Sequence, residues 1–181
     1  ITEQKFIEAQ SAAQQLCGIL KSPSCAKFLP ELQILARSED SINKIKQNGA
    51  DKSNYTNLRN NCDQSDDYKK INCQMLLQNF SPYSKYVLTS EERDCSRKNA
   101  NSDAYEQCVS GILKEALNIF MEPCKKFGSS CAPLERIQSQ ADQIDSLVTP
   151  STSVADTPKP ANIAAESKDD HDFIAQEFTG C

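Results

Sequence analysis

The sequence predicts an all-α protein, a bundle of about five to six helices built from disulfide-linked helical hairpins and followed by an extended C-terminal tail. Three observations predict this class. Apolar residues recur every three or four positions through most of residues 1–148, which is the period of an amphipathic helix. The chain has only 5 glycines, and the alternating pattern of β-strands is scarce. Eight of the nine cysteines form sequential pairs around the expected helix breaks.

The first two helices are predicted over residues 3–20 and 30–48. Pro23 interrupts the pattern between them, and Pro30 suits the first position of a helix because its missing amide hydrogen has no intrahelical partner there. Gly49 is a typical residue just beyond a helix C-terminus. In the first helix the apolar residues share one face by their spacing: Phe6, Ala9, Ala13, Leu16, Cys17 and Leu20.

The middle of the chain predicts a short helix over residues 51–61 and a longer one over residues 66–80, with Ser65 as its N-cap. Ser81-Pro82 is expected to end the longer helix. Beyond it, an apolar loop cluster is expected from Tyr83, Tyr86 and Val87.

Thr89 and Glu92 have the spacing of a capping box, which predicts a short helix from there to Lys98. The most apolar helical stretch follows from residue 102. Because it is apolar around most of its circumference, we expect other helices to enclose it. Its N-cap is expected at Ser102 or Asp103, and Pro123 is expected to end or sharply kink it. A last helix is predicted from Pro133 to residue 148.

The cysteines predict four local disulfides, because 6 to 12 residues separate the members of each sequential pair and each pair brackets a helix break. There is no C-x-x-C motif, and the single histidine does not suggest a zinc site. Disulfides persist in oxidising compartments, so we expect an exported protein of the periplasm, the cell surface or the extracellular space. Its first residues fit a chain from which a signal peptide has been removed. The expected pairs are Cys17–Cys25, Cys62–Cys73, Cys95–Cys108 and Cys124–Cys131.

Residues 149–181 are predicted to form a separate linker and tail, after a helical domain over residues 1–148. The segment is rich in Ser, Thr, Pro and Ala and carries six acidic but two basic side chains. Its end regains apolar character with Phe173, Ile174 and Phe178, which predicts a docking segment. Cys181 is left unpaired or available for an intermolecular bond, so a homo-oligomer through Cys181 or the tail is possible.

The sequence offers no catalytic, metal-binding or cofactor-binding constellation. It lacks the Walker, Rossmann and nucleophile-elbow patterns, and its one histidine lies in the tail. Residues 1–148 are nearly neutral and show no basic footprint for nucleic acid. No apolar run approaches the ~20 residues of a transmembrane helix. These observations favour binding over chemistry.

The favoured hypothesis is therefore a non-enzymatic, exported protein that binds another macromolecule, most simply a protein. One alternative is a carrier of small apolar ligands, with Tyr83, Tyr86 and the central helix lining a cavity. A second alternative is a hydrolase that depends on carboxylates alone, which requires two acids facing each other across a cleft.

Overall fold

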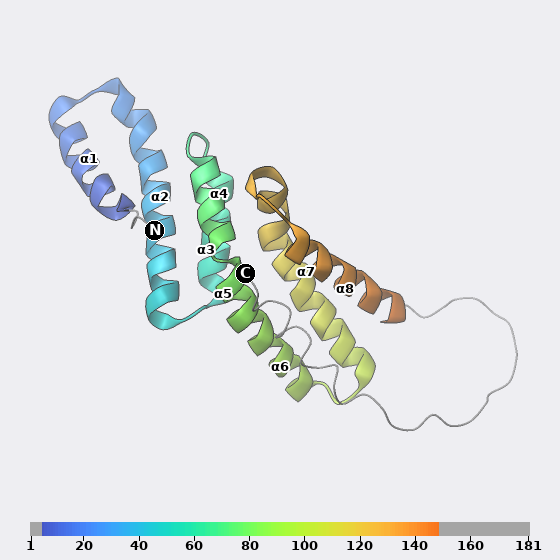
Figure 1. Ribbon diagram of the computed structural model, residues 1–181. Helices are drawn as coiled ribbons and strands as arrows, with labels where there is room; N and C mark the ends of the chain where they lie inside the picture. The colour runs from blue at the N-terminus through green and yellow to red at the C-terminus, as the bar shows by residue number, and fades with distance from the viewer. Residues whose placement is uncertain (1–4, 149–181) are drawn as a thin grey trace, which may run out of the picture.

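The computed structural model describes residues 5–148, which form helices throughout and lie side by side in an elongated row (Figure 1). The predicted all-α architecture of disulfide-linked hairpins is confirmed. The predicted tail, with Cys181, Phe173, Ile174 and Phe178, lies outside the described residues. The elements in order are α1 (Phe6–Leu20), α2 (Pro23–Asn48), α3 (Lys52–Gln64), α4 (Lys69–Gln78), α5 (Phe80–Pro82), the π-helix η1 (Tyr83–Leu88), α6 (Thr89–Lys98), α7 (Ser102–Phe127) and α8 (Ala132–Val148).

Three disulfides join two consecutive helices close to the turn between them, and the fourth joins α7 to Cys131, the residue just before α8. The four pairs are the sequential ones expected from the spacing. The Cα–Cα distances run from 4.6 Å in Cys62–Cys73 to 5.9 Å in Cys124–Cys131. Cys17–Cys25 joins α1 to α2, and Cys95–Cys108 joins α6 to α7. Each bond therefore restrains one hairpin and links no distant parts of the chain.

Helix α2 begins seven residues earlier than predicted, at Pro23, and continues through Pro30. Pro23, and not Pro30, occupies the first position of α2. Pro30 leaves the carbonyl of Ala26 without its helical donor, and Ala26 is exposed, so water can supply the missing bond. The predicted end of this helix is confirmed, since Gly49 adopts a positive φ of 88° at the C-cap.

The buried carboxylate of Glu31 in α2 organises the turn between α3 and α4. It accepts hydrogen bonds from the Ser65 hydroxyl at 2.7 Å and from the backbone amides of Asp66 and Tyr68. Ser65 is therefore not the N-cap of a helix that starts at residue 66. Its hydroxyl is bound by Glu31, and α4 begins only at Lys69.

The expected loop cluster at residues 83–87 is helical, because α5, η1 and α6 continue into one another without a break. Tyr83, Val87 and Leu88 are buried, whereas Tyr86 is exposed. Thr89 does not form the predicted capping box, since the chain is already helical before it and its hydroxyl donates to the Ser84 carbonyl. Burial of the apolar residues outweighs the local turn signals of Ser81-Pro82.

Helix α7 is the central helix, in contact with α3, α4, α6, η1 and α8. Its N-cap is Asn101 and neither of the predicted residues Ser102 and Asp103, and the Asn101 side chain accepts from the Ala104 amide at 2.8 Å. The helix continues past Pro123 to Phe127, so Pro123 does not end it. Pro123 cannot donate to the Ile119 carbonyl, and the guanidinium of Arg59 in α3 donates to that oxygen instead, at 3.3 Å. The neighbouring helix thus makes the proline tolerable.

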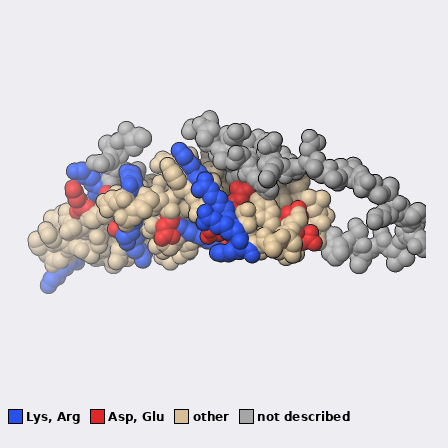
Figure 2. Space-filling model, turned by 90° about the horizontal axis from the view of Figure 1, so that it is seen from below, with Lys and Arg blue, Asp and Glu red and all other residues tan. Residues whose placement is uncertain are grey.

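Arg59 also forms ion pairs with Asp63 of its own helix at 2.9 Å and with Glu122 of α7 at 2.7 Å, so it joins α3 to α7 at two points. Lys126 and Arg59 together hold the pKa of Glu122 at about 2. On the face seen in Figure 2, basic side chains form a band with acidic side chains beside them. Exposed pairs of this kind add little stability. No helix within residues 5–148 is long and apolar enough to cross a membrane.

Candidate binding site

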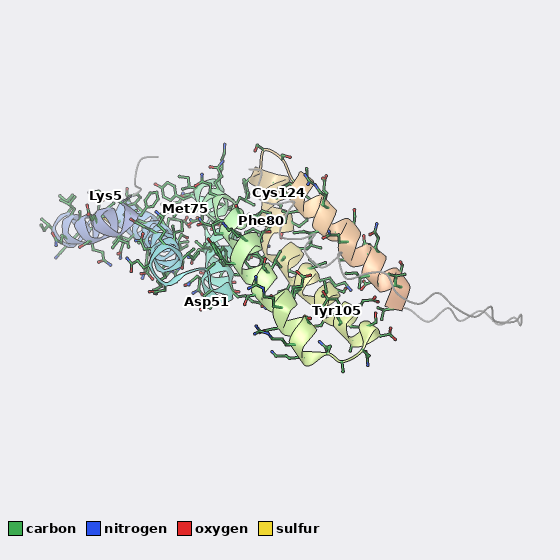
Figure 3. All side chains as sticks on the ribbon, turned by 60° about the horizontal axis from the view of Figure 1, so that its bottom comes forward. Lys5, Asp51, Met75, Phe80, Tyr105 and Cys124 are labelled. Atoms are coloured by element: carbon green, nitrogen blue, oxygen red, sulfur yellow. A yellow bond between two sulfur atoms is a disulfide. The ribbon has the colours of Figure 1, made fainter. Side chains whose placement is uncertain are left out.

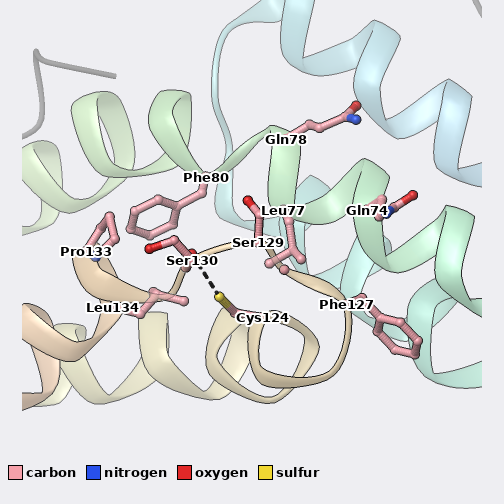
Figure 4. A pocket seen from close by; sticks show the side chains of 11 residues that line it. Gln74, Leu77, Gln78, Phe80, Cys124, Phe127, Ser129, Ser130, Pro133 and Leu134 are labelled. Carbon is pink, nitrogen blue, oxygen red and sulfur yellow. Dashed lines mark hydrogen bonds between the residues drawn. The ribbon is translucent and has the colours of Figure 1, made fainter.

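A pocket of about 390 Å³ lies between the C-terminal end of α4, Phe80 and the turn that joins α7 to α8 (Figure 4). We call it the turn pocket. Phe80 and Cys124, which come from different elements, lie close together there (Figure 3). The pocket is open on one side. Its walls are formed by Gln74, Leu77, Gln78, Phe80, Cys124, Phe127, Gly128, Ser129, Ser130, Pro133 and Leu134.

The tight turn after α7 shapes one wall of the turn pocket. The Cys124–Cys131 disulfide closes the turn, and the Gly128 amide donates to the Cys124 carbonyl at 2.8 Å. A Cβ at Gly128 would lie 2.7 Å from that carbonyl oxygen and 2.9 Å from the Cys124 sulfur. Only glycine allows this approach. The sulfur also lies 3.4 Å from the Ser130 carbonyl, so the disulfide and the turn are packed against each other.

The lining of the turn pocket is mainly apolar, with amide and hydroxyl groups among the apolar side chains. Among the described residues that line it, none has an ionisable side chain except Cys124, which is oxidised in its disulfide. Five apolar side chains are accompanied by the amides of Gln74 and Gln78 and the hydroxyls of Ser129 and Ser130. A serine nucleophile needs an adjacent base, and no lining residue provides one. Such a surface can hold apolar groups while its rim hydrogen-bonds to peptide or other polar groups.

A separate polar cluster brings two acids from different helices to one lysine. The Lys52 ammonium of α3 lies between Glu91 of α6, at 3.0 Å, and Glu115 of α7. Partial burial opposes the charge on Lys52, but hydrogen bonds and charge attraction from both carboxylates raise its pKa overall. The lysine occupies the space that a substrate or a water molecule would require between two catalytic acids. The cluster therefore serves to join three helices.

The interior near Tyr83 is filled by aromatic rings. Tyr83 is fully buried. The centroid of its ring lies 4.9 Å from the ring centroid of Tyr55 and 5.0 Å from that of Phe120. Burial raises the pKa of both tyrosines above its usual range. Neither hydroxyl has a hydrogen-bond partner among the described residues. Tyr86 is 56% exposed. A cavity was expected at Tyr83 and Tyr86, but neither residue lines the turn pocket.

The sequence did not predict the residues of the turn pocket. The signal that could have indicated it is Gly128 inside the short Cys124–Cys131 loop, followed by Pro133. The eight paired cysteines are structural, and four of them, Cys62, Cys73, Cys95 and Cys124, are almost fully buried. Within residues 5–148, no three side chains gather that could hold a metal ion.

Comparison with known proteins identifies no relative. No protein-family model, no curated protein and no solved structure matches the chain. The function of this protein is therefore argued from its own geometry.

Proposed function

We propose that this chain is an exported, non-enzymatic binding protein whose turn pocket receives apolar side chains of a protein partner. The observation that carries this proposal is the lining of the pocket, which is apolar with an amide and hydroxyl rim and has no ionisable group that could drive a reaction. Glutamine and serine side chains can both donate to and accept from a peptide backbone. They suit a partner segment that presents one or two large apolar residues.

The four disulfides support export. Their bonds require an oxidising compartment, and together they restrain every turn between long helices except the connection from α2 to α3. A rigid pocket wall also lowers the entropic cost of binding, because the turn of the pocket is already ordered.

The test is selection of peptides from a random displayed library on the immobilised, oxidised protein. We expect the selected peptides to be rich in large apolar residues. Ser129→Arg, which places a long charged side chain at the mouth of the pocket, should abolish their binding. Ser96→Arg on α6 is the matched control, because Ser96 is also exposed but lies far from the pocket lining. Equal binding by both variants would contradict the proposal.

A small apolar ligand is the second candidate, because the pocket volume of about 390 Å³ lies within the range of small-molecule sites. Anilinonaphthalene sulfonate, a fluorescent dye that reports apolar sites, separates the two possibilities. Strong fluorescence that Ser129→Arg removes, together with failure to select any peptide, would favour a carrier of small ligands.

The hydrolase alternative has the weakest support. Its best pair of acids, Glu91 and Glu115, is bridged by Lys52 and lies outside the turn pocket.

A further inference from the structure

Helix α1 has two apolar faces, and only one of them is covered. Phe6, Gln10, Ala13 and Cys17, at steps of four, three and four residues, are half-buried on the side that packs against α2. The helix stands at the outer end of the row and none of its 15 residues is buried (Figure 1). Ala9, Ala12 and Leu16 of the second face stand one position before Gln10, Ala13 and Cys17 of the first. Because successive residues lie about 100° apart around a helix, the second face is turned from the first by that angle.

The second face, which we call the outer seam, has the spacing of a coiled coil. Ala9, Ala12, Leu16 and Ile19 follow one another at steps of three, four and three residues, and all four are exposed. Leu16 is 57% exposed and Ile19 78% exposed. Between Ile7 and Leu20 the only charged side chain is Glu8. A helix that is apolar on two sides is normally packed between other helices, and within residues 5–148 no helix covers the outer seam.

The order of small and large residues in the outer seam indicates what covers it. If a second copy packs against it in the antiparallel direction, Ala12 lies opposite Leu16 and Ala9 lies opposite Ile19 of the other copy. Every layer then combines a small with a large side chain, which is the arrangement that fills an interface evenly. Parallel packing would place Ala9 against Ala9 and Ile19 against Ile19, leaving a gap at one end and crowding the other.

The charges agree with the same arrangement. In the antiparallel pair Glu8 of one copy, which already lies 3.7 Å from the Lys5 ammonium of its own chain, comes beside the C-terminal end of the other α1, where Lys21 follows the helix. In a parallel pair Glu8 would face Glu8. Because a two-fold interface brings the same surface together from both copies, a nearly uncharged seam is also free of self-repulsion.

We propose that two copies of this chain form a dimer in which the outer seams of α1 pack antiparallel around a two-fold axis. The two α1–α2 hairpins then form one four-helix layer at the centre of the dimer. The dimer does not depend on the turn pocket, since no residue of α1 lines that pocket. It also differs from a dimer linked through Cys181.

Sedimentation equilibrium of the full, oxidised chain tests the dimer, and every sample carries Cys181→Ser so that an intermolecular disulfide cannot contribute. We expect a monomer–dimer equilibrium. Leu16→Glu with Ile19→Glu should raise the dissociation constant by roughly 30-fold or more, the effect of losing a central interface residue. Leu147→Glu is the matched control, because Leu147 is equally apolar and 74% exposed on α8. It should leave the dissociation constant unchanged.

A size exchange tests the direction of packing. Leu16→Ala alone should weaken the dimer, and adding Ala12→Leu should restore it, because each layer again combines one large and one small residue. Circular dichroism and thermal melting check that all variants remain folded. A protein that is monomeric at all concentrations with Cys181→Ser, a dimer that survives Leu16→Glu with Ile19→Glu, or a size exchange that fails to restore association would overturn the proposal.

Discussion

The buried carboxylate of Glu31 is the group whose removal should most affect how α2 is attached to the rest of the protein. Glu31 is 8% exposed, and its two oxygens divide the bonds unequally. Oε2 accepts from the Ser65 hydroxyl at 2.7 Å and from the amides of Asp66 and Tyr68, each at 3.3 Å, whereas Oε1 accepts only from the Asp66 amide, at the shorter distance of 3.1 Å. Glu31→Gln can therefore keep the bonds to Oε2, but its NH₂ group would face the Asp66 amide.

Glu31→Gln should lower the free energy of unfolding by about 1.5 kcal/mol, the lower end of the range for hydrogen bonds to a charged group. Glu31→Ala should cost more, roughly 3 kcal/mol, because it also leaves the buried Ser65 hydroxyl without an acceptor. Guanidinium denaturation followed by circular dichroism measures both values. Glu135→Gln on the exposed start of α8 is the control, with an expected change below about 0.5 kcal/mol.

The loss of stability caused by Glu31→Gln should become smaller as the pH falls. Burial opposes ionisation of Glu31, but the hydrogen bonds from Ser65, Asp66 and Tyr68 outweigh it and lower its pKa below 4.5. The ionised group thus stabilises the fold above about pH 4.5, and this stabilisation is lost as the pH falls through the lower pKa of the folded state. The difference in the free energy of unfolding between the wild type and Glu31→Gln should therefore shrink at acidic pH. A difference that is the same at pH 7 and pH 2 would refute this account.

Three further substitutions give results of different sign or size. Tyr83→Phe should leave stability unchanged or raise it by up to ~1–2 kcal/mol, because its buried hydroxyl has no partner among the described residues; thermal melting would show a loss if a partner exists. Arg59→Met should cost about 2 kcal/mol in denaturant unfolding, since it leaves the Ile119 carbonyl beside Pro123 unpaired; no loss would mean that the carbonyl is otherwise solvated. Replacing both Cys62 and Cys73 with Ala should cost about 3 kcal/mol, the entropy of a loop of this length, and an unchanged denaturation midpoint would disprove that role.

The sequence predicts the helices and their disulfide pairs because both depend on residues close together in the chain. Periodicity of three to four residues needs only one helix, and a pair such as Cys124–Cys131 needs only one turn. Tyr55 and Leu58, three residues apart on α3, are both buried, as the period of an amphipathic helix requires. Here local pattern and tertiary structure agree.

The errors arise where a distant residue changes the meaning of a local signal. Pro123 normally ends a helix, but Arg59, 64 positions earlier, binds the carbonyl that it leaves free. Ser65 resembles an N-cap, but Glu31 takes its hydroxyl. Neither partner can be identified from spacing along the chain. The turn pocket is missed for the same reason, since α4 and the α7–α8 turn meet only in the folded protein.

The outer seam of α1 is a different kind of error. Ala9, Leu16 and Leu20 were expected on the same covered face as Phe6, Ala13 and Cys17, yet the structure divides the two groups between an exposed and a covered side. A helix whose apolar surface is too wide for one neighbouring helix to cover has the same periodic pattern of apolar residues in its sequence as a helix whose single wide apolar face is fully covered. The sequence alone does not distinguish the two cases.

The placement of the disulfides has a consequence for how the protein matures. The eight cysteines within residues 5–148 bond as first to second, third to fourth, fifth to sixth and seventh to eighth, with sequence separations of only 7 to 13 residues. If such a chain enters an oxidising compartment from its N-terminus, the first cysteine of each pair meets its correct partner before any later cysteine has entered. Closing such short loops has a small entropic cost, and contacts so local form quickly. Oxidation of a chain with this pattern can thus proceed as the chain emerges, without the slow exchange of mispaired bonds that interleaved disulfides require.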